Sequence, residues 1–205
     1  MLAIYNHKVV FLALLILLSI GGSFGASSSG CGTNTTTDDG DNSTSDLTLT
    51  SSEAGDGFNP NGSIPKKFAC PDTGGTDELP TLSWSNAPST TKSFALTMID
   101  ITTEPDTIHM VLFDISKSAT SVTDEDDFND TNSAVNYSGT RSYAGPCPPT
   151  ADAAHTYEFT LYALDVTTLV SETNADSTNA NDTIAKIKEH DVDSDKISGT
   201  FKAEQ

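Results

Sequence analysis

Residues 93–100 read SFALTMID, and this run is apolar on both sides when it is extended. Alternate residues of a β-strand point to opposite faces, so one strand can bury two sets of side chains. Those sets are Phe94, Leu96 and Met98 on one face and Ala95, Thr97 and Ile99 on the other. The pattern predicts a strand in the middle of a sheet, with both of its faces covered.

Two later runs have the same character, HMVLFDI at residues 109–115 and HTYEFTLYAL at residues 155–164. Turn-forming clusters separate them. Only residues 181–190 have a helical pattern, in which Ile184 and Ile187 share a face and Asn181 or Asp182 can cap the start. Residues 57–205 are therefore predicted to fold as one mainly antiparallel β-sandwich domain.

The chain begins with a targeting signal. Residues 9–20, VVFLALLILLSI, are almost entirely apolar and follow Lys8. Such a run is too short to cross a bilayer, which takes about 20 helical residues. We interpret residues 1–30 as a secretory signal peptide, which places the mature protein in the periplasm or outside the cell.

Two processing routes remain open at this signal. The small residues around Ser23 and Gly25 suit ordinary cleavage before Ala26. Alternatively, residues 28–31, SSGC, resemble a lipoprotein box that would make Cys31 a lipidated first residue, although the aliphatic residue usual at the first position is missing. In the second case the only membrane contact would be an N-terminal lipid anchor.

The next segment, residues 31–56, consists mainly of Thr, Ser, Asn, Gly and Asp. It carries too little apolar area to offset the entropy lost on ordering, so we expect a disordered polar linker. A first edge strand near Leu47 and Leu49 could end it.

The negative net charge argues against two classes of partner, nucleic acids and anionic lipid surfaces. The chain has 10 Lys and Arg against 29 Asp and Glu, a formal net charge of -19. Nucleic-acid binding requires clustered cations that neutralise phosphates, and adsorption to anionic lipid requires the same. Neither partner is expected.

Three cysteines occur, and Cys31 lies outside the predicted domain. Cys70 and Cys147 remain as a pair, and export to an oxidising compartment favours a disulfide between them. The alternative is two free thiols, one of which, Cys147, could act as a nucleophile with His155 in a thiol-dependent enzyme.

Polar groups lie at the ends of the predicted strands, on faces that otherwise bury apolar side chains. They are Asp100 at the end of one strand, His109 at the start of the next, and His155 with Tyr157 at the start of the third. If these ends meet, they form a small polar pocket whose groups need a ligand or one another as partners. Alternatively, each one lies at the rim of the sandwich and meets water.

A proline-rich loop, residues 143–149 (YAGPCPP), precedes the third strand. Its prolines lack N–H groups, so Gly145 and Cys147 carry most of its remaining backbone donors. Such donors could hold an anion without a lysine. Alternatively, the loop is only a rigid turn.

Several of these segments together resemble the phosphatidylethanolamine-binding protein family, in its bacterial and archaeal Raf kinase inhibitor-like branch. The resemblance rests on Ser83-Trp84, Ala87-Pro88, SYAGPCPP at residues 142–149 and H-x-Y-x-F-x-x-YALD at residues 155–165, and it covers about residues 57–202. It implies an antiparallel Greek-key β-sandwich with one or two short helices, no cofactor, and a small anion-binding pocket. By matching positions, the pocket would be lined by Asp100, His109, Tyr143, Gly145, Pro146, His155 and Tyr157.

The chain departs from the family pattern in two places. Asp100 is followed by residues 101–105, ITTEP, where the family usually has Pro-Asp-x-Pro, and Met110 stands where an aromatic residue is common. We expect a small phosphorylated or anionic ligand held by His109, His155 and a backbone N–H near Gly145, with Asp100 orienting one imidazole. Binding should strengthen as pH falls toward the histidine pKa of about 6.5.

Two other functions compete with this one, the thiol-dependent enzyme that uses Cys147 and His155 and an interaction with a protein partner. The protein could instead inhibit or bind a protein partner, such as an exported protease. Asp191-x-Asp193-x-Asp195 resembles the start of a calcium loop, but Lys196 occupies its glycine position, so we interpret the segment as a solvated acidic turn and expect no metal.

Overall fold

The computed structural model describes residues 46–123, 128, 131–173 and 179–204. The predicted signal peptide, Cys31 and the first part of the predicted linker lie outside these residues. No helix in the described part of the chain is long and apolar enough to span a membrane.

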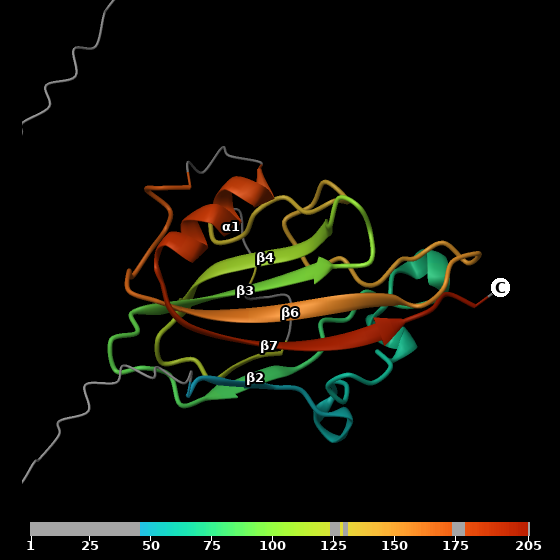
Figure 1. Cartoon of the computed structure of the whole chain (residues 1–205), viewed down its shortest axis with the longest axis horizontal. Helices are drawn as coiled ribbons and strands as arrows, with labels where there is room; N and C mark the ends of the chain where they lie inside the picture. The colour runs from blue at the N-terminus through green and yellow to red at the C-terminus, as the bar shows by residue number, and fades with distance from the viewer. Residues whose placement is uncertain (1–45, 124–127, 129–130, 174–178, 205) are drawn as a thin grey trace, which may run out of the picture. The chain divides into compact units, whose positions relative to one another are not determined.

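Two antiparallel sheets form the domain (Figure 1). The small sheet has the order β1-β2-β5 and the large sheet the order β4-β3-β6-β7. The small sheet contains β1 (Thr48–Thr50), β2 (Leu82–Ser85) and β5 (Ser121–Val122). The large sheet contains β3 (Ser93–Asp100), β4 (Thr107–Ser116), β6 (His155–Leu164) and β7 (Asp191–Phe201).

Strand β3 lies between β4 and β6, as its sequence predicts. Its first face, with Phe94, Leu96 and Met98, packs into a core that also contains Leu82 and Trp84 of the small sheet. Its second face, which includes Ala95, packs with residues of the helix. Both faces of the large sheet are therefore covered, and the fold is a mainly β sandwich with one α-helix.

The helix α1 (Ala180–Glu189) covers the outer face of the large sheet, where Figure 1 shows it above β4. Ile184 and Ile187 are buried there, as predicted. The predicted cap, Asn181 or Asp182, was wrong: Asn179 is the cap, and its side chain accepts a hydrogen bond from the Asn181 N–H. An asparagine side chain caps the turn that follows it, and Asn179 and Asn181 could both do so by sequence.

The predicted acidic turn at residues 191–195 is wrong, because these residues form the first half of β7. Asp193 Oδ2 accepts a hydrogen bond from the Leu47 N–H at 3.1 Å, and Asp195 Oδ2 accepts one from the Leu49 N–H at 2.7 Å. These contacts hold β1, the predicted edge strand, on the domain. The folded domain therefore begins before residue 57, which is the N-terminal boundary predicted from the sequence.

The predicted Cys70–Cys147 disulfide is present, with 5.4 Å between the Cα atoms. It joins the 3₁₀ turns η2 (Lys66–Phe68) and η3 (Pro71–Thr73) to the proline-rich loop. The Cys70 N–H also donates to the Pro146 carbonyl at 3.1 Å. In this form Cys147 has no thiol, which excludes it as a catalytic nucleophile.

Candidate functional site

The strand ends that carry the polar residues meet at one end of the large sheet. Asp100 closes β3, and its partner in the ladder is Tyr157 of β6. The His109 and Tyr157 rings meet edge to face, with 5.2 Å between their centroids, and the His155 and Tyr157 rings are 6.5 Å apart. Asp100, His109, His155 and Tyr157 therefore form one cluster, which we call the histidine cluster.

Asp100 and His155 form a buried pair. His155 Nδ1 donates to Asp100 Oδ2 at 2.7 Å, while Asp100 Oδ1 accepts from the Thr102 N–H at 2.9 Å. Both carboxylate oxygens are thus used, and the imidazole is held in one orientation with Nε2 directed away from the pair. That Nε2 lies 3.5 Å from Asp152 Oδ2 at the rim.

His109 is almost fully buried and donates from Nδ1 to the Ala144 carbonyl at 2.7 Å. A carbonyl can only accept, so the proton is on Nδ1 and Nε2 is an acceptor in the neutral ring. Burial lowers the pKa of His109, and the Ala144 carbonyl and the Asp100 charge offset only part of that effect. His109 therefore presents a hydrogen-bond acceptor at neutral pH.

Tyr157 is completely buried, yet its hydroxyl forms no hydrogen bond with the described residues. Burial and the nearby Asp100 carboxylate raise its pKa strongly, and the Cys147 N–H partly opposes this rise. The Cys147 N–H itself donates to no backbone carbonyl of the described residues. The Cys147 N–H thus faces the Tyr157 hydroxyl oxygen, and the Asp100 carboxylate lies beside both groups.

In the proline-rich loop, the Gly145 N–H does not have the role expected from the sequence. The Gly145 N–H was expected to be available to an anion, but it donates to Asp77 Oδ1 at 2.7 Å. The Tyr143 hydroxyl donates to the Phe68 carbonyl at 2.9 Å, so it braces the loop against η2. The Pro146 carbonyl accepts from Cys70. Of the two loop donors proposed from the sequence, Gly145 donates to a side-chain carboxylate and Cys147 donates to no backbone carbonyl of the described residues.

Sequence reasoning missed two members of this region, Asp77 and Tyr137. The Tyr137 ring is half-exposed and lies over His109, with 4.6 Å between the ring centroids. Both residues come from irregular segments, so no strand or helix pattern marks them. Asp77 stands in a turn cluster rich in Gly and Thr, where an acidic residue ordinarily indicates only solvation.

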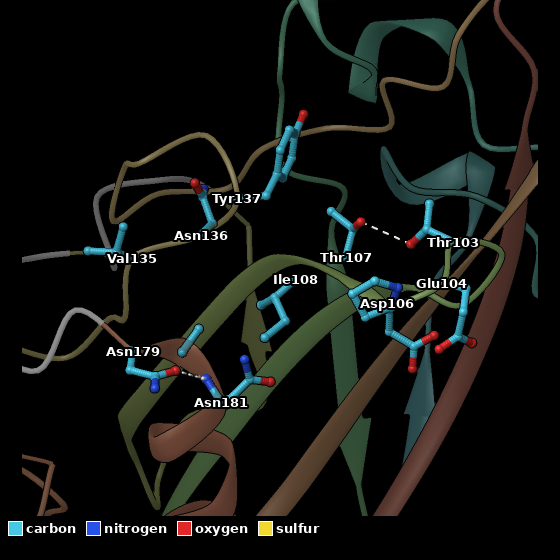
Figure 2. A pocket seen from close by; sticks show the side chains of 12 residues that line it. Thr103, Glu104, Asp106, Thr107, Ile108, Val135, Asn136, Tyr137, Asn179 and Asn181 are labelled. Carbon is cyan, nitrogen blue, oxygen red and sulfur yellow. Dashed lines mark hydrogen bonds between the residues drawn. The ribbon is translucent and has the colours of Figure 1, made fainter.

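A surface groove of about 710 Å³ lies beside Tyr137 (Figure 2). Residues 103–108, residues 135–137 and residues 179–181 line it, so it runs from the turn after β3 to the start of α1. Tyr137 belongs to both the groove and the surroundings of the histidine cluster, because it lines the groove and also covers His109. The groove carries the carboxylates of Glu104 and Asp106 and no basic side chain.

No group of three or more His, Cys, Asp or Glu side chains among the described residues could hold a metal ion. Asp193 and Asp195, which resembled calcium ligands by spacing, use carboxylate oxygens to bind backbone N–H groups.

Comparison with known proteins gives one consistent result. A family model described as phosphatidylethanolamine-binding protein matches residues 54–202. The chain is 34% identical over 157 residues to a UPF0098 protein of Methanothermobacter thermautotrophicus, covering 71% of this chain and 94% of that one. It is also 33% identical over 125 residues to LppC of Mycobacterium tuberculosis, whose name proposes a lipoprotein, covering 58% of this chain and 56% of LppC.

Two solved structures have the same fold. A phosphatidylethanolamine-binding protein homologue from Chlamydia trachomatis, CT736, superposes with a TM-score of 0.62 and 26% identity, covering 76% of this chain and 97% of that chain. YbcL of E. coli superposes with a TM-score of 0.64 and 23% identity, covering 76% of this chain and 98% of that chain.

Proposed function

Because this chain belongs to the phosphatidylethanolamine-binding protein family, we propose that it is an exported binding protein for a small phosphoryl-bearing anion held at the histidine cluster. Export is supported by the apolar N-terminal run, by the disulfide and by the name of the relative LppC. A lipid anchor at Cys31 belongs to the same proposal.

The observation that carries the proposal is the Tyr157 hydroxyl, which is completely buried and forms no hydrogen bond with the described residues. A buried hydroxyl without a partner costs about 1–3 kcal/mol, so native proteins rarely leave one unsatisfied. An oxygen atom of a ligand at the histidine cluster would accept from the Tyr157 O–H. Anionic oxygens form the strongest bonds of this kind.

The histidines then make binding depend on pH. In the neutral ring His109 accepts at Nε2, and it donates there to a ligand oxygen only once the ring is protonated. The Nδ1–H of His155 donates to the Asp100 carboxylate. Its Nε2 can therefore donate to a ligand only when the ring is protonated. Outside the histidine cluster, the organic part of such a ligand would bind in the groove next to Tyr137.

The proposal is tested by calorimetric titration of the full chain with inorganic phosphate and phosphoethanolamine. Tyr157→Phe removes the unfilled hydroxyl and should weaken binding about tenfold or more, because a hydrogen bond to a charged group contributes about 1.5–3 kcal/mol. Tyr162→Phe is the matched control, since Tyr162 packs in the hydrophobic cluster between the large sheet and α1. The affinity of this variant for both compounds should equal that of the wild type. Wild-type protein that binds neither compound, or a Tyr157→Phe variant that binds like wild type, contradicts the proposal.

Affinity should also rise as pH falls below about 6.5. The free protein has a lowered His109 pKa, and an anion favours the protonated ring, so binding takes up a proton and strengthens through this range. Dimethyl phosphate is the right probe, because its single charge stays constant between pH 5 and pH 8. His109→Gln should flatten the rise. A titration in which the wild-type affinity is constant from pH 8 to pH 5 would rule out this role for the imidazoles.

A further inference from the structure

We propose that the Asp77 carboxylate is a specificity-determining competitor for the ligand: it holds the Gly145 N–H that a ligand oxygen would otherwise take, and so selects singly charged over doubly charged oxyanions. The inference rests on the proposed function, because it concerns which anions the same site accepts.

One hydrogen bond and two electrostatic effects place Asp77 at the site. Its Oδ1 accepts from the Gly145 N–H at 2.7 Å. Its negative charge acts on the buried ring of His109, where it partly opposes the lowering of that pKa by burial. It also contributes, after burial, to the raised pKa of Tyr137, which lies over His109. The carboxylate is therefore close to the groups that a ligand would contact.

No cation offsets this charge. Asp77 forms no ion pair with any Lys, Arg or His among the described residues, whereas Asp100 is paired with His155 and Asp152 lies near the same ring. Three carboxylates thus stand around two histidines, one of which is neutral at pH 7. Coulomb energy scales with the product of the charges, so a doubly charged ligand meets about twice the repulsion that a singly charged one meets.

The backbone fixes Asp77 in this position. Its φ is 54°, in the left-handed region that Asp and Asn tolerate better than most residues, and its N–H donates to the Ala69 carbonyl at 2.9 Å. On the other side, a Cβ at Gly145 would lie 2.8 Å from Asp77 Oδ1 and 2.1 Å from the Phe68 carbonyl. Only glycine allows this approach, and the Cys70–Cys147 disulfide ties the two segments together.

Three variants separate the charge from the hydrogen bond. Asp77→Asn keeps an oxygen near the Gly145 N–H and removes the charge. Asp77→Gly removes both and suits the positive φ, whereas alanine there would be strained. Asp72→Asn is the matched control, because Asp72 is an exposed residue of η3 that also acts on Tyr137 but does not contact Gly145.

The experiment measures the affinity of the full chain for sulfate and for dimethyl phosphate at pH 7 by calorimetry. We expect Asp77→Asn to raise the affinity for sulfate about tenfold and the affinity for dimethyl phosphate about threefold. The gain in binding free energy is then twice as large for the doubly charged anion, as the product of the charges requires. Asp77→Gly should tighten both at least as much, since it also frees the Gly145 N–H. Asp72→Asn should change either affinity by less than about twofold.

The possible failures are distinguishable. If wild-type protein binds dimethyl phosphate and neither Asp77 variant changes its affinity or that for sulfate, Asp77 does not compete and only this inference is overturned. An equal gain in affinity in the Asp72→Asn variant would also overturn it, because the gain would then come from the lower net charge of the protein and not from Asp77. If no variant binds either probe, the proposed function fails and the inference fails with it.

Discussion

Loss of the Cys70–Cys147 disulfide is expected to lower the free energy of unfolding by about 4 kcal/mol. The two cysteines are 77 residues apart, so the bridge closes a long loop and removes much of the entropy of the unfolded chain. In the folded state it also holds η3 against the proline-rich loop. For a domain of ordinary stability this change is a large fraction of the total.

Urea denaturation of the oxidised wild type and of a Cys70→Ser/Cys147→Ser double variant measures this effect. Cys31→Ser is the control, because Cys31 lies outside the folded domain predicted from the sequence and its replacement should leave the midpoint unchanged. A double variant within about 1 kcal/mol of wild type would mean that the remaining contacts between the two segments hold them without the bridge.

Replacement of Asp100 by alanine is expected to cost about 3–5 kcal/mol of stability, because it breaks a buried pair and leaves its partner unsatisfied. The Asp100 side chain is 4% exposed, and its carboxylate serves both His155 and the Thr102 N–H. Asp100→Asn should cost less, since an amide oxygen can still accept one of these bonds. Both variants should also weaken phosphate binding, because His155 loses its orientation.

The chain contains a matched control for this prediction. His190 and Asp165 form a pair with a similar distance, 2.8 Å, but the Asp165 side chain is 53% exposed. Asp165→Ala should therefore change the free energy of unfolding by about 1 kcal/mol or less. Equal losses in Asp100→Ala and Asp165→Ala would show that burial does not govern the strength of the Asp100 pair.

The sequence predicts the large sheet well, because hydrophobic periodicity is a local signal. The run at residues 93–100 requires cover on both faces, and the structure supplies the small sheet on one face and α1 on the other. The same alternation predicts that Asp100, His109 and His155 lie at strand ends on faces that bury apolar side chains, and the structure brings these ends together. The pairing of Asp100 with His155 follows from strand order, which no local pattern contains.

The failures at Asp77 and at residues 191–195 have a different cause, since each concerns a polar side chain whose partner is far away in the chain. Asp77 meets Gly145 across 68 residues, and Asp195 meets Leu49 across 146. An exposed acidic residue and a structural one look alike in the sequence of so acidic a chain. The spacing of Asp191, Asp193 and Asp195 resembles a calcium loop without its glycine and so favours a solvated turn, whereas the strand places two of these carboxylates against the Leu47 and Leu49 N–H groups.

The contacts of Asp193 and Asp195 have a further consequence for how copies of the domain meet. β1 pairs with β2 on one side only, and the open side of a strand is ordinarily a template on which another chain can add. Here the Leu47 and Leu49 N–H groups on that side are already bound by carboxylates. A second copy that approached this edge would find these donors occupied and would meet two negative charges. The edge is thereby protected from strand-by-strand aggregation.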